Sequence, residues 1–360
     1  MDKIDDILTI LTPDDFNRAA MRVFRRQSIE CQPYRDYLDL IGVDPARDVD
    51  NVDKIPFLPI ELFKSQRVYC GKEEPETVFT SSATGGEGPS RHYVAHLADY
   101  ERVYTRGFEL FYDSPEKYTI FALLPSYLER EGSSLVSMTN GLIQRGLEHE
   151  KGGGFYLRNH TKLLADMAEK TAQKNGENSD TGNELKLLLG VSYALLDLAE
   201  ELAEKGEKLP PKTIVMETGG MKGRRKEMLK SLMHSTLREA FGVETIHSEY
   251  GMAELMSQAY SHGAGIFRTP PWMRVVVRDL NDPFDVRPFR CNTNSYSKKN
   301  APEKTNKIHR GGINIIDLAN LWSCSFIQTQ DVGSVAPDGS FTIDGRIARS
   351  DIRGCNLLVQ

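Results

Sequence analysis

The chain has 360 residues, enough for one large domain or two ordinary ones, and 45 Lys and Arg against 51 Asp and Glu give a net charge of −6. No basic block is long enough for a nucleic-acid-binding surface, and no apolar run is long enough to predict a membrane span. The five cysteines are scattered and odd in number, and the acidic N-terminus lacks a signal-peptide core, so we expect a cytoplasmic protein without a disulfide framework.

The first third of the chain predicts helices, a connector and then a strand, a loop and a helix. Apolar residues recur at helical spacing between residues 2 and 28. Residues 55–64 form an apolar run broken by Pro56 and Pro59, which predicts an ordered connector on the core rather than a central strand. A β-prone run ending at Phe79 is followed by a polar loop and by a helical pattern over 93–111.

The rest of the chain alternates strands with helices and then changes character. We predict strands over 118–124, 186–191 and 213–217, and helices over 133–145 and 193–202, which together predict an α/β sheet that is at least partly parallel. Past about residue 270, short β-type segments separated by turns predict an antiparallel subdomain, with strands over 273–277, 313–318, 325–329 and 341–343. We therefore divide the chain into an N-terminal helical segment (1–50), an α/β core (51–270), a β-rich subdomain of the same unit (271–344) and a short C-terminal tail (345–360).

The loop after Phe79 is rich in hydroxyls and glycines, and reads Thr-Ser-Ser-Ala-Thr-Gly-Gly-Glu-Gly-Pro-Ser-Arg-His over 80–92. Backbone N–H groups beside glycines and side-chain hydroxyls both suit phosphate oxygens, and Arg91 and His92 can add positive charge. The spacing of a Walker loop is absent. A polar surface turn is the alternative interpretation, so other segments have to support the functional one.

Two further segments offer groups for a nucleotide. In Glu217–Arg224, the glycines Gly219 and Gly220 follow a strand and would let a flat ring lie against bare backbone. In Ser248–Glu254, Tyr250 can stack on a base, Gly251 leaves room for it, and Glu254 can hold a hard cation beside phosphates. Each segment alone also fits an ordinary glycine-rich turn or a solvated charge.

The last third adds a carboxylate and a thiol. Asp331 follows a β-type segment, and a carboxylate at a strand end can accept two ribose hydroxyls, although an Asp-containing turn is the common alternative. Cys355 lies close to Arg346, Arg349 and Arg353, whose charges favour the nucleophilic thiolate. The alternative for a single cysteine is an inert apolar side chain.

In order and spacing, these segments resemble the successive motifs of the adenylate-forming enzymes. Within that superfamily the chain resembles the LuxE-type acyl-protein synthetases, the synthetase component of the fatty-acid reductase in bacterial bioluminescence. The residues that carry this closer resemblance are 55–64, 90–92, 191–196, 217–224 and 353–358. The resemblance extends from about residue 50 to the end of the chain.

The resemblance implies the large-domain fold of adenylate-forming enzymes, with partly parallel sheets and a β-rich subdomain, lacking most or all of the C-terminal mobile domain. It implies that a fatty or aryl acid attacks the α-phosphorus of ATP with Mg²⁺, and that the acyl group then passes to Cys355 and to a partner protein, an acyl reductase or an acyl carrier. Arg346 would contact the nucleotide and Glu254 would bind the metal. The nucleotide-binding residues that the resemblance implies are Thr80, Ser81, Ser82, Thr84, Gly85, Gly219, Gly220, Glu249, Tyr250, Gly251 and Asp331.

Two other functions stay open. Ser82 and Ala83 stand where the superfamily loop usually has Gly and Thr, and Ala83 removes a hydroxyl from the predicted phosphate loop. A non-catalytic nucleotide-binding relative is therefore one alternative. The other is an acyl- or aryl-CoA ligase similar to the phenylacetate-CoA ligases, in which the CoA thiol replaces Cys355.

Overall fold

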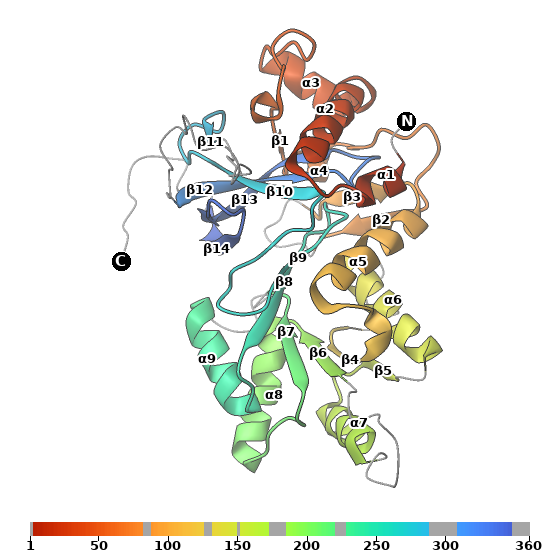
Figure 1. Cartoon of the computed structure of the whole chain (residues 1–360), viewed down its shortest axis with the longest axis vertical. Helices are drawn as coiled ribbons and strands as arrows, with labels where there is room; N and C mark the ends of the chain where they lie inside the picture. Colours follow the sequence, from red (N-terminus) through yellow and green to blue (C-terminus); the bar gives the residue numbers. More distant parts are fainter. Residues whose placement is uncertain are drawn as a thin grey trace, which may run out of the picture. The chain divides into compact units, whose positions relative to one another are not determined.

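The computed structural model describes residues 3–81, 88–125, 132–149, 152–172, 185–219, 228–287 and 308–347. The contacts between Cα atoms divide the chain into two compact units (Figure 1). Unit 1 consists of residues 1–74 and 271–360, and unit 2 consists of residues 75–270. None of the helices in the described part of the chain combines the length and the apolar character that crossing a membrane requires.

Unit 2 is built on a six-stranded sheet in the order β5-β4-β6-β7-β8-β9. Its strands are β4 (Tyr118–Leu123), β5 (Gly153–Phe155), β6 (Leu185–Gly190), β7 (Thr213–Glu217), β8 (Ile246–Tyr250) and β9 (Ala259–Ser261). The first five strands in this order are parallel, and β9 pairs antiparallel with β8. Strands β4 and β6 are mostly apolar and almost entirely buried, because a parallel sheet is covered on both faces, which confirms the predicted α/β sheet.

The helices of unit 2 connect these strands. They are α5 (Leu97–Tyr112), η2 (Pro115–Lys117), α6 (Ser134–Glu148), α7 (His160–Ala172), α8 (Ser192–Lys205) and α9 (Lys230–Phe241). Figure 1 shows α8 and α9 together beside β7 and β8, and α6 packs against β4. Both α8 and α9 end at a left-handed glycine, Gly206 and Gly242, which supplies the positive φ that stops a helix. The periodicity therefore located α6 and α8 correctly, whereas α7 and α9 were not predicted.

The prediction for the segment after the polar loop is wrong in one respect. Strand β2 (Thr77–Thr80) is followed by a second strand, β3 (Arg91–Val94), and the two form an antiparallel hairpin in which Phe79 faces His92. The helix α5 begins at Leu97, four residues later than the helical pattern indicated. Residues 91–94 alternate between exposed and more buried positions, which is a strand pattern too short to outweigh the longer helical one beside it. The loop thus joins two strands of a hairpin.

Unit 1 contains the second six-stranded sheet, in which β1-β13-β12-β10-β11 lie in order and β14 pairs with β13. The strands are β1 (Leu58–Pro59), β10 (Met273–Arg278), β11 (Val286–Arg287), β12 (His309–Asp317), β13 (Phe326–Val335) and β14 (Phe341–Arg346). All pairs are antiparallel except that of β1 with β13, which confirms the antiparallel segments predicted past residue 270. The proline-broken run forms only the short edge strand β1 and α4 (Leu62–Ser65), as expected of a connector.

The N-terminal helices complete unit 1. They are α1 (Ile4–Leu8), α2 (Pro13–Glu30) and α3 (Gln32–Leu40), followed by the turn η1 (Val52–Lys54). Thr12 caps α2 by accepting a hydrogen bond from the Asp15 N–H, and Pro13 occupies the first helical position. The buried Gln27 side chain donates to the Asn320 carbonyl and accepts from the Ser325 N–H. This exchange fixes α2 on the turn before β13, because neither polar group has water available as an alternative.

Candidate functional site

The base of the polar loop is closed by hydrogen bonds between its two ends. The Ser81 hydroxyl accepts from the Ser90 N–H at 3.0 Å, and the Ser81 N–H donates to the Ser90 carbonyl at 3.3 Å. The Thr80 N–H donates to the carbonyl of Gly132, at 2.7 Å. Of the predicted phosphate-binding residues, Thr80 and Ser81 therefore stand at the neck of the loop. Ser82, Thr84 and Gly85 lie outside the described residues.

A buried histidine connects the loop with the predicted metal-binding segment. The Nδ1 atom of His92 lies 2.8 Å from the carbonyl oxygen of Ala253, although the two residues are 161 positions apart. His92 is 1% exposed, and its neighbour in the chain, Arg91, points to solvent. Because Ala253 directly precedes Glu254, the hydrogen bond brings the exit of the loop to the segment that carries the predicted metal ligand. The sequence indicated His92 only as a possible charge beside phosphate, and not as this link.

Glu254 itself is buried, with 6% of its surface exposed. The described residues contain no cluster of three or more His, Cys, Asp or Glu side chains able to hold a metal ion. A magnesium ion that arrives with ATP needs only one or two protein carboxylates, because phosphate oxygens and water complete its coordination. One buried carboxylate next to a candidate phosphate loop fits that donor set.

The turn after β7 is fixed by the buried carboxylate of Glu217. One oxygen, Oε2, accepts from the Gly219 N–H at 2.7 Å and from the Ser192 hydroxyl at 3.4 Å. The other, Oε1, lies 2.6 Å from Lys230 Nζ and 3.5 Å from His234 Nε2. Burial acts to raise the pKa of Glu217, but the hydrogen bond from His234 and the charge and hydrogen bond of Lys230 outweigh it and hold the pKa at about 2. Glu217 is therefore an ionised, fully paired anchor for the turn.

Gly219 has the backbone conformation that this turn requires. Its φ is +72°, a region that residues other than glycine rarely adopt, and nothing lies within 4 Å of the position where a Cβ atom would stand. The backbone of Gly219 is thus open toward its surroundings while its N–H is held by Glu217. Gly220 lies outside the described residues. The sequence indicated the glycines, but it did not indicate that Glu217 holds them.

Tyr250 stands at the end of the neighbouring strand. Strands β7 and β8 are parallel, with Glu217 opposite Ser248. Gly219 and Tyr250 therefore both lie at the carboxyl ends of adjacent strands. Ligands of open α/β sheets bind outside these ends. The Tyr250 ring packs at 60° against the Phe267 ring, with 5.9 Å between the ring centroids. We call the edge formed by Gly219 and Tyr250 the base slot.

Glu249 is an unusual carboxyl group beside this slot. It is 8% exposed, and burial, reinforced by the nearby charge of Glu217, raises its pKa to about 8. A Cβ atom on Gly251 would stand 2.5 Å from Glu249 Oε1, so a larger residue there would require this carboxyl group to shift. The structure thus gives Gly251 a packing role, in addition to the room for a ring that the sequence indicated.

In unit 1, the structure pairs the predicted ribose-binding carboxylate with the predicted hinge arginine. Arg346 Nε lies 3.2 Å from Asp331 Oδ1, across the hairpin of β13 and β14. Asp331 is 5% exposed and lies inside β13, so the prediction that it ends a strand is wrong. The strand continues because Gly333 allows close pairing with β14, where a Cβ atom would stand 1.9 Å from the Thr342 carbonyl oxygen. Cys355 lies outside the described residues.

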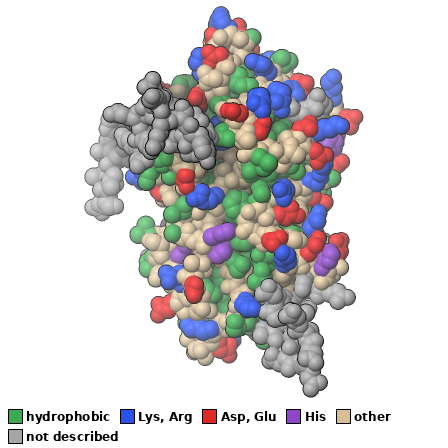
Figure 2. Space-filling view, viewed as in Figure 1, with side chains coloured by type: hydrophobic (Ala, Val, Ile, Leu, Met, Phe, Trp, Pro, Cys, Tyr) green, Lys and Arg blue, Asp and Glu red, His purple; other side chains and the backbone are tan. Residues whose placement is uncertain are grey.

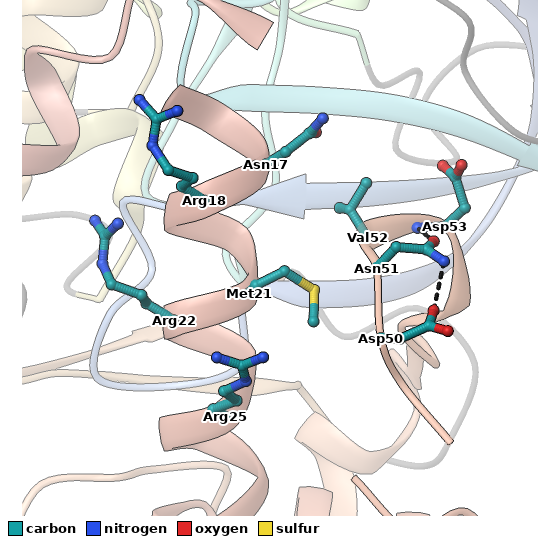
Figure 3. A pocket seen from close by; sticks show the side chains of 9 residues that line it. All are labelled: Asn17, Arg18, Met21, Arg22, Arg25, Asp50, Asn51, Val52 and Asp53. Carbon is teal, nitrogen blue, oxygen red and sulfur yellow. Dashed lines mark hydrogen bonds between the residues drawn. The ribbon is translucent and has the colours of Figure 1, made fainter. Parts of the chain in front are cut away.

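A surface cavity of about 540 Å³ also lies in unit 1 (Figure 3). Asn17 and Met21 point from α2 toward residues 50–53, whereas Arg18 and Arg22 extend from the helix on the other side (Figure 3). None of the predicted site residues lines this cavity. On the face shown in Figure 2, the described Lys and Arg side chains alternate with Asp and Glu, as the balanced composition leads one to expect.

Neither a protein-family model nor a curated protein matches the sequence. Solved structures of 2-hydroxyisobutyryl-CoA ligase do match the fold. The open conformation in complex with 2-HIB-AMP and CoA aligns with a TM-score of 0.56 at 13% identity, covering 93% of this chain and 70% of that one. The postadenylation state with R3-HIB-AMP has a TM-score of 0.57 at 14% identity, covering 93% and 67%. The described part of the chain therefore shares the fold of these ligase structures.

This structural match confirms the fold class that the sequence predicts. The thioesterification state of the same ligase, in complex with 2-HIB-AMP and CoA, aligns equally well, with a TM-score of 0.57 over 94% of this chain. The neighbours are thus ligases that join acids to CoA. The resemblance to acyl-protein synthetases stays a prediction.

Proposed function

We propose that the protein activates a carboxylic acid with ATP and transfers the acyl group to its own Cys355. The observation that carries the first half is the contact of His92 with Ala253, which joins a hydroxyl-rich loop to the segment with Tyr250 and Glu254 on an adenylate-forming fold. An anion-binding loop, an aromatic ring and a buried carboxylate are the groups that a nucleotide triphosphate with a divalent cation needs.

Each group has a defined task in the first step. A carboxylate oxygen of the acid forms a bond to the α-phosphorus of ATP, and the bond from that phosphorus to the bridging oxygen breaks, releasing pyrophosphate. Thr80 and Ser81 would bind phosphate oxygens, Gly219 and Tyr250 would flank the base, and Asp331 would hold the ribose. Glu254 would hold Mg²⁺, whose charge offsets that of the phosphates.

In the second step, the thiolate of Cys355 attacks the acyl carbon. The new bond joins sulfur to that carbon, the bond from the carbon to the adenylate oxygen breaks, and AMP leaves. The thioester would then serve an acyl reductase or an acyl carrier, to which a fatty or aryl group passes. Support for this step comes from the sequence alone, from a cysteine near three arginines whose charges favour the thiolate.

An acyl-CoA ligase is the second candidate function. It is favoured by one observation, that structures of the matching fold contain 2-HIB-AMP together with CoA, as their names state. In that case the CoA thiol takes the place of Cys355 and no acyl group stays on the protein.

Pyrophosphate release and intact-protein mass decide among these functions. The protein is incubated with MgATP and a panel of fatty and aryl acids, and we expect pyrophosphate release with at least one acid and an acyl adduct that hydroxylamine removes. Cys355→Ser should still release pyrophosphate but carry no adduct, whereas the control Cys291→Ser should be acylated like the parent. Acyl-CoA formation without an adduct would establish the CoA ligase instead, and ATP binding without pyrophosphate release would establish a non-catalytic relative.

A further inference from the structure

Helix α9 is the connection between β7 and β8, the two strands whose ends form the base slot. Its first residue is Lys230, and the Lys230 Nζ lies 2.6 Å from Glu217 Oε1. The opposite oxygen of that carboxylate accepts the hydrogen bond of the Gly219 N–H at 2.7 Å. Lys230 therefore holds the Gly219 side of the base slot through Glu217.

The same ammonium group reaches the other side of the slot. Lys230 Nζ lies 4.6 Å from the centroid of the Phe267 ring, a distance at which a cation and an aromatic face attract each other. Phe267 is 2% exposed and packs against the Tyr250 ring. The ring of Tyr250 is thus supported by a side chain that Lys230 covers.

Both contacts depend on the positive charge of Lys230. The Glu217 side chain is 1% exposed, and removing the cation beside a buried carboxylate strongly destabilises the folded protein. His234, which lies 3.5 Å from the same carboxylate, is a weaker substitute for Lys230 as its partner. The contact with Phe267 requires a cation as well, because it depends on the negative face of the ring. An uncharged side chain at position 230 would lose both contacts, and an arginine would retain both.

We infer that Lys230 is a positioning residue for the nucleotide base: it holds the Gly219 turn through Glu217 and the Tyr250 ring through Phe267, and so sets the width of the base slot. It touches the reacting atoms of neither substrate. This inference rests on the proposed nucleotide-binding function. It predicts that loss of the Lys230 charge weakens the binding of the nucleotide base and leaves the binding of the phosphates unchanged.

Calorimetric titration of the full chain with MgATP, MgUTP and inorganic tripolyphosphate tests this role. We expect Lys230→Met to weaken the binding of ATP about tenfold, which is about 1.4 kcal/mol, and to bring it close to that of UTP. The affinity for tripolyphosphate should stay within about twofold, since the loop at Thr80 and Ser81 does not involve Lys230. Lys230→Arg should retain the preference for ATP.

Lys205→Met is the matched control, because Lys205 also forms a 2.6 Å ion pair, with Glu201, but at the far end of α8. It should bind ATP like the parent. A Lys230→Met variant that keeps the parent's preference for ATP over UTP would overturn the inference. If that variant fails to fold, Phe267→Leu takes its place and must lose the same preference, or the inference is wrong. A parent that does not bind ATP at all would refute the proposed function itself, which is a different outcome.

Discussion

Glu249→Gln removes a buried carboxyl group whose ionisation opposes folding. Burial, and then the charge of Glu217, raise its pKa from 4.5 to about 8, while Lys230 acts in the opposite direction. Because the pKa is raised in the folded state, the unfolded chain loses this proton first. Stability should therefore fall as the pH rises from about 4.5 to about 8. At about 1.36 kcal/mol per pKa unit, the rise in the pKa of Glu249 from 4.5 to about 8 corresponds to a loss of at most about 5 kcal/mol in the free energy of unfolding.

The glutamine keeps the shape of the side chain but cannot ionise, so the variant should escape this loss. Thermal unfolding of the parent and the variant at pH 5, 6.5, 8 and 9 measures the effect, and we expect similar midpoints at pH 5 and a growing advantage of the variant toward pH 9. Glu148→Gln, which changes an exposed glutamate at the end of α6, is the control and should have little effect at any pH. A difference between parent and Glu249→Gln that is independent of pH, or an advantage of the parent at pH 9, would refute the reasoning.

The remaining predictions concern three other positions. Gly251→Ala places a Cβ atom 2.5 Å from Glu249 Oε1, so the carboxyl group must shift. We expect a loss of about 1 kcal/mol in unfolding free energy in urea denaturation and weaker ATP binding, and an unchanged midpoint would contradict the packing role. Glu254→Gln should reduce magnesium-dependent pyrophosphate release at least about tenfold, and equal rates in parent and variant would exclude the metal role. Gly153 has a φ of +111° and lies where a Cβ atom would stand 2.2 Å from the Ile120 carbonyl oxygen. Gly153→Ala should therefore destabilise the pairing of β5 with β4 by about 1–3 kcal/mol, whereas Gly107→Ala, at a helical glycine with open space around it, should not.

The sequence predicted strands β4, β6 and β7 closely, because a buried strand leaves a local run of apolar residues, whereas β5, β8 and β9 were not predicted. The apolar run 213–217 coincides with β7, and the run 118–124 differs from β4 by one residue. Strand β3 was missed, because its four residues form a strand only through pairing with β2, and this pairing depends on a partner across the loop. The same limit explains Asp331, because β13 continues beyond this residue through its pairing with β12 and β14.

The candidate site shows the same division. The glycine and the tyrosine of the base slot were recognisable from residue type alone, since a glycine can adopt a positive φ and a tyrosine carries a ring that can stack on a base. The contacts that hold them were not recognisable. The sequence offered one signal for a paired buried carboxylate. Glu217 precedes the glycine turn, and Lys230 and His234 follow it four residues apart.

By itself, the sequence predicted strands β4, β6 and β7, the helices α6 and α8, the antiparallel strands past residue 270, and the turns that carry glycines, hydroxyls and carboxylates. The tertiary structure decided which of these groups meet: His92 with Ala253, Lys230 with Glu217 and Phe267, and Arg346 with Asp331. The reason is physical. Backbone conformation and hydrophobic periodicity depend on neighbours in the chain, whereas a buried charge or polar group takes its partner from whichever element packs against it, and its distance along the chain does not enter.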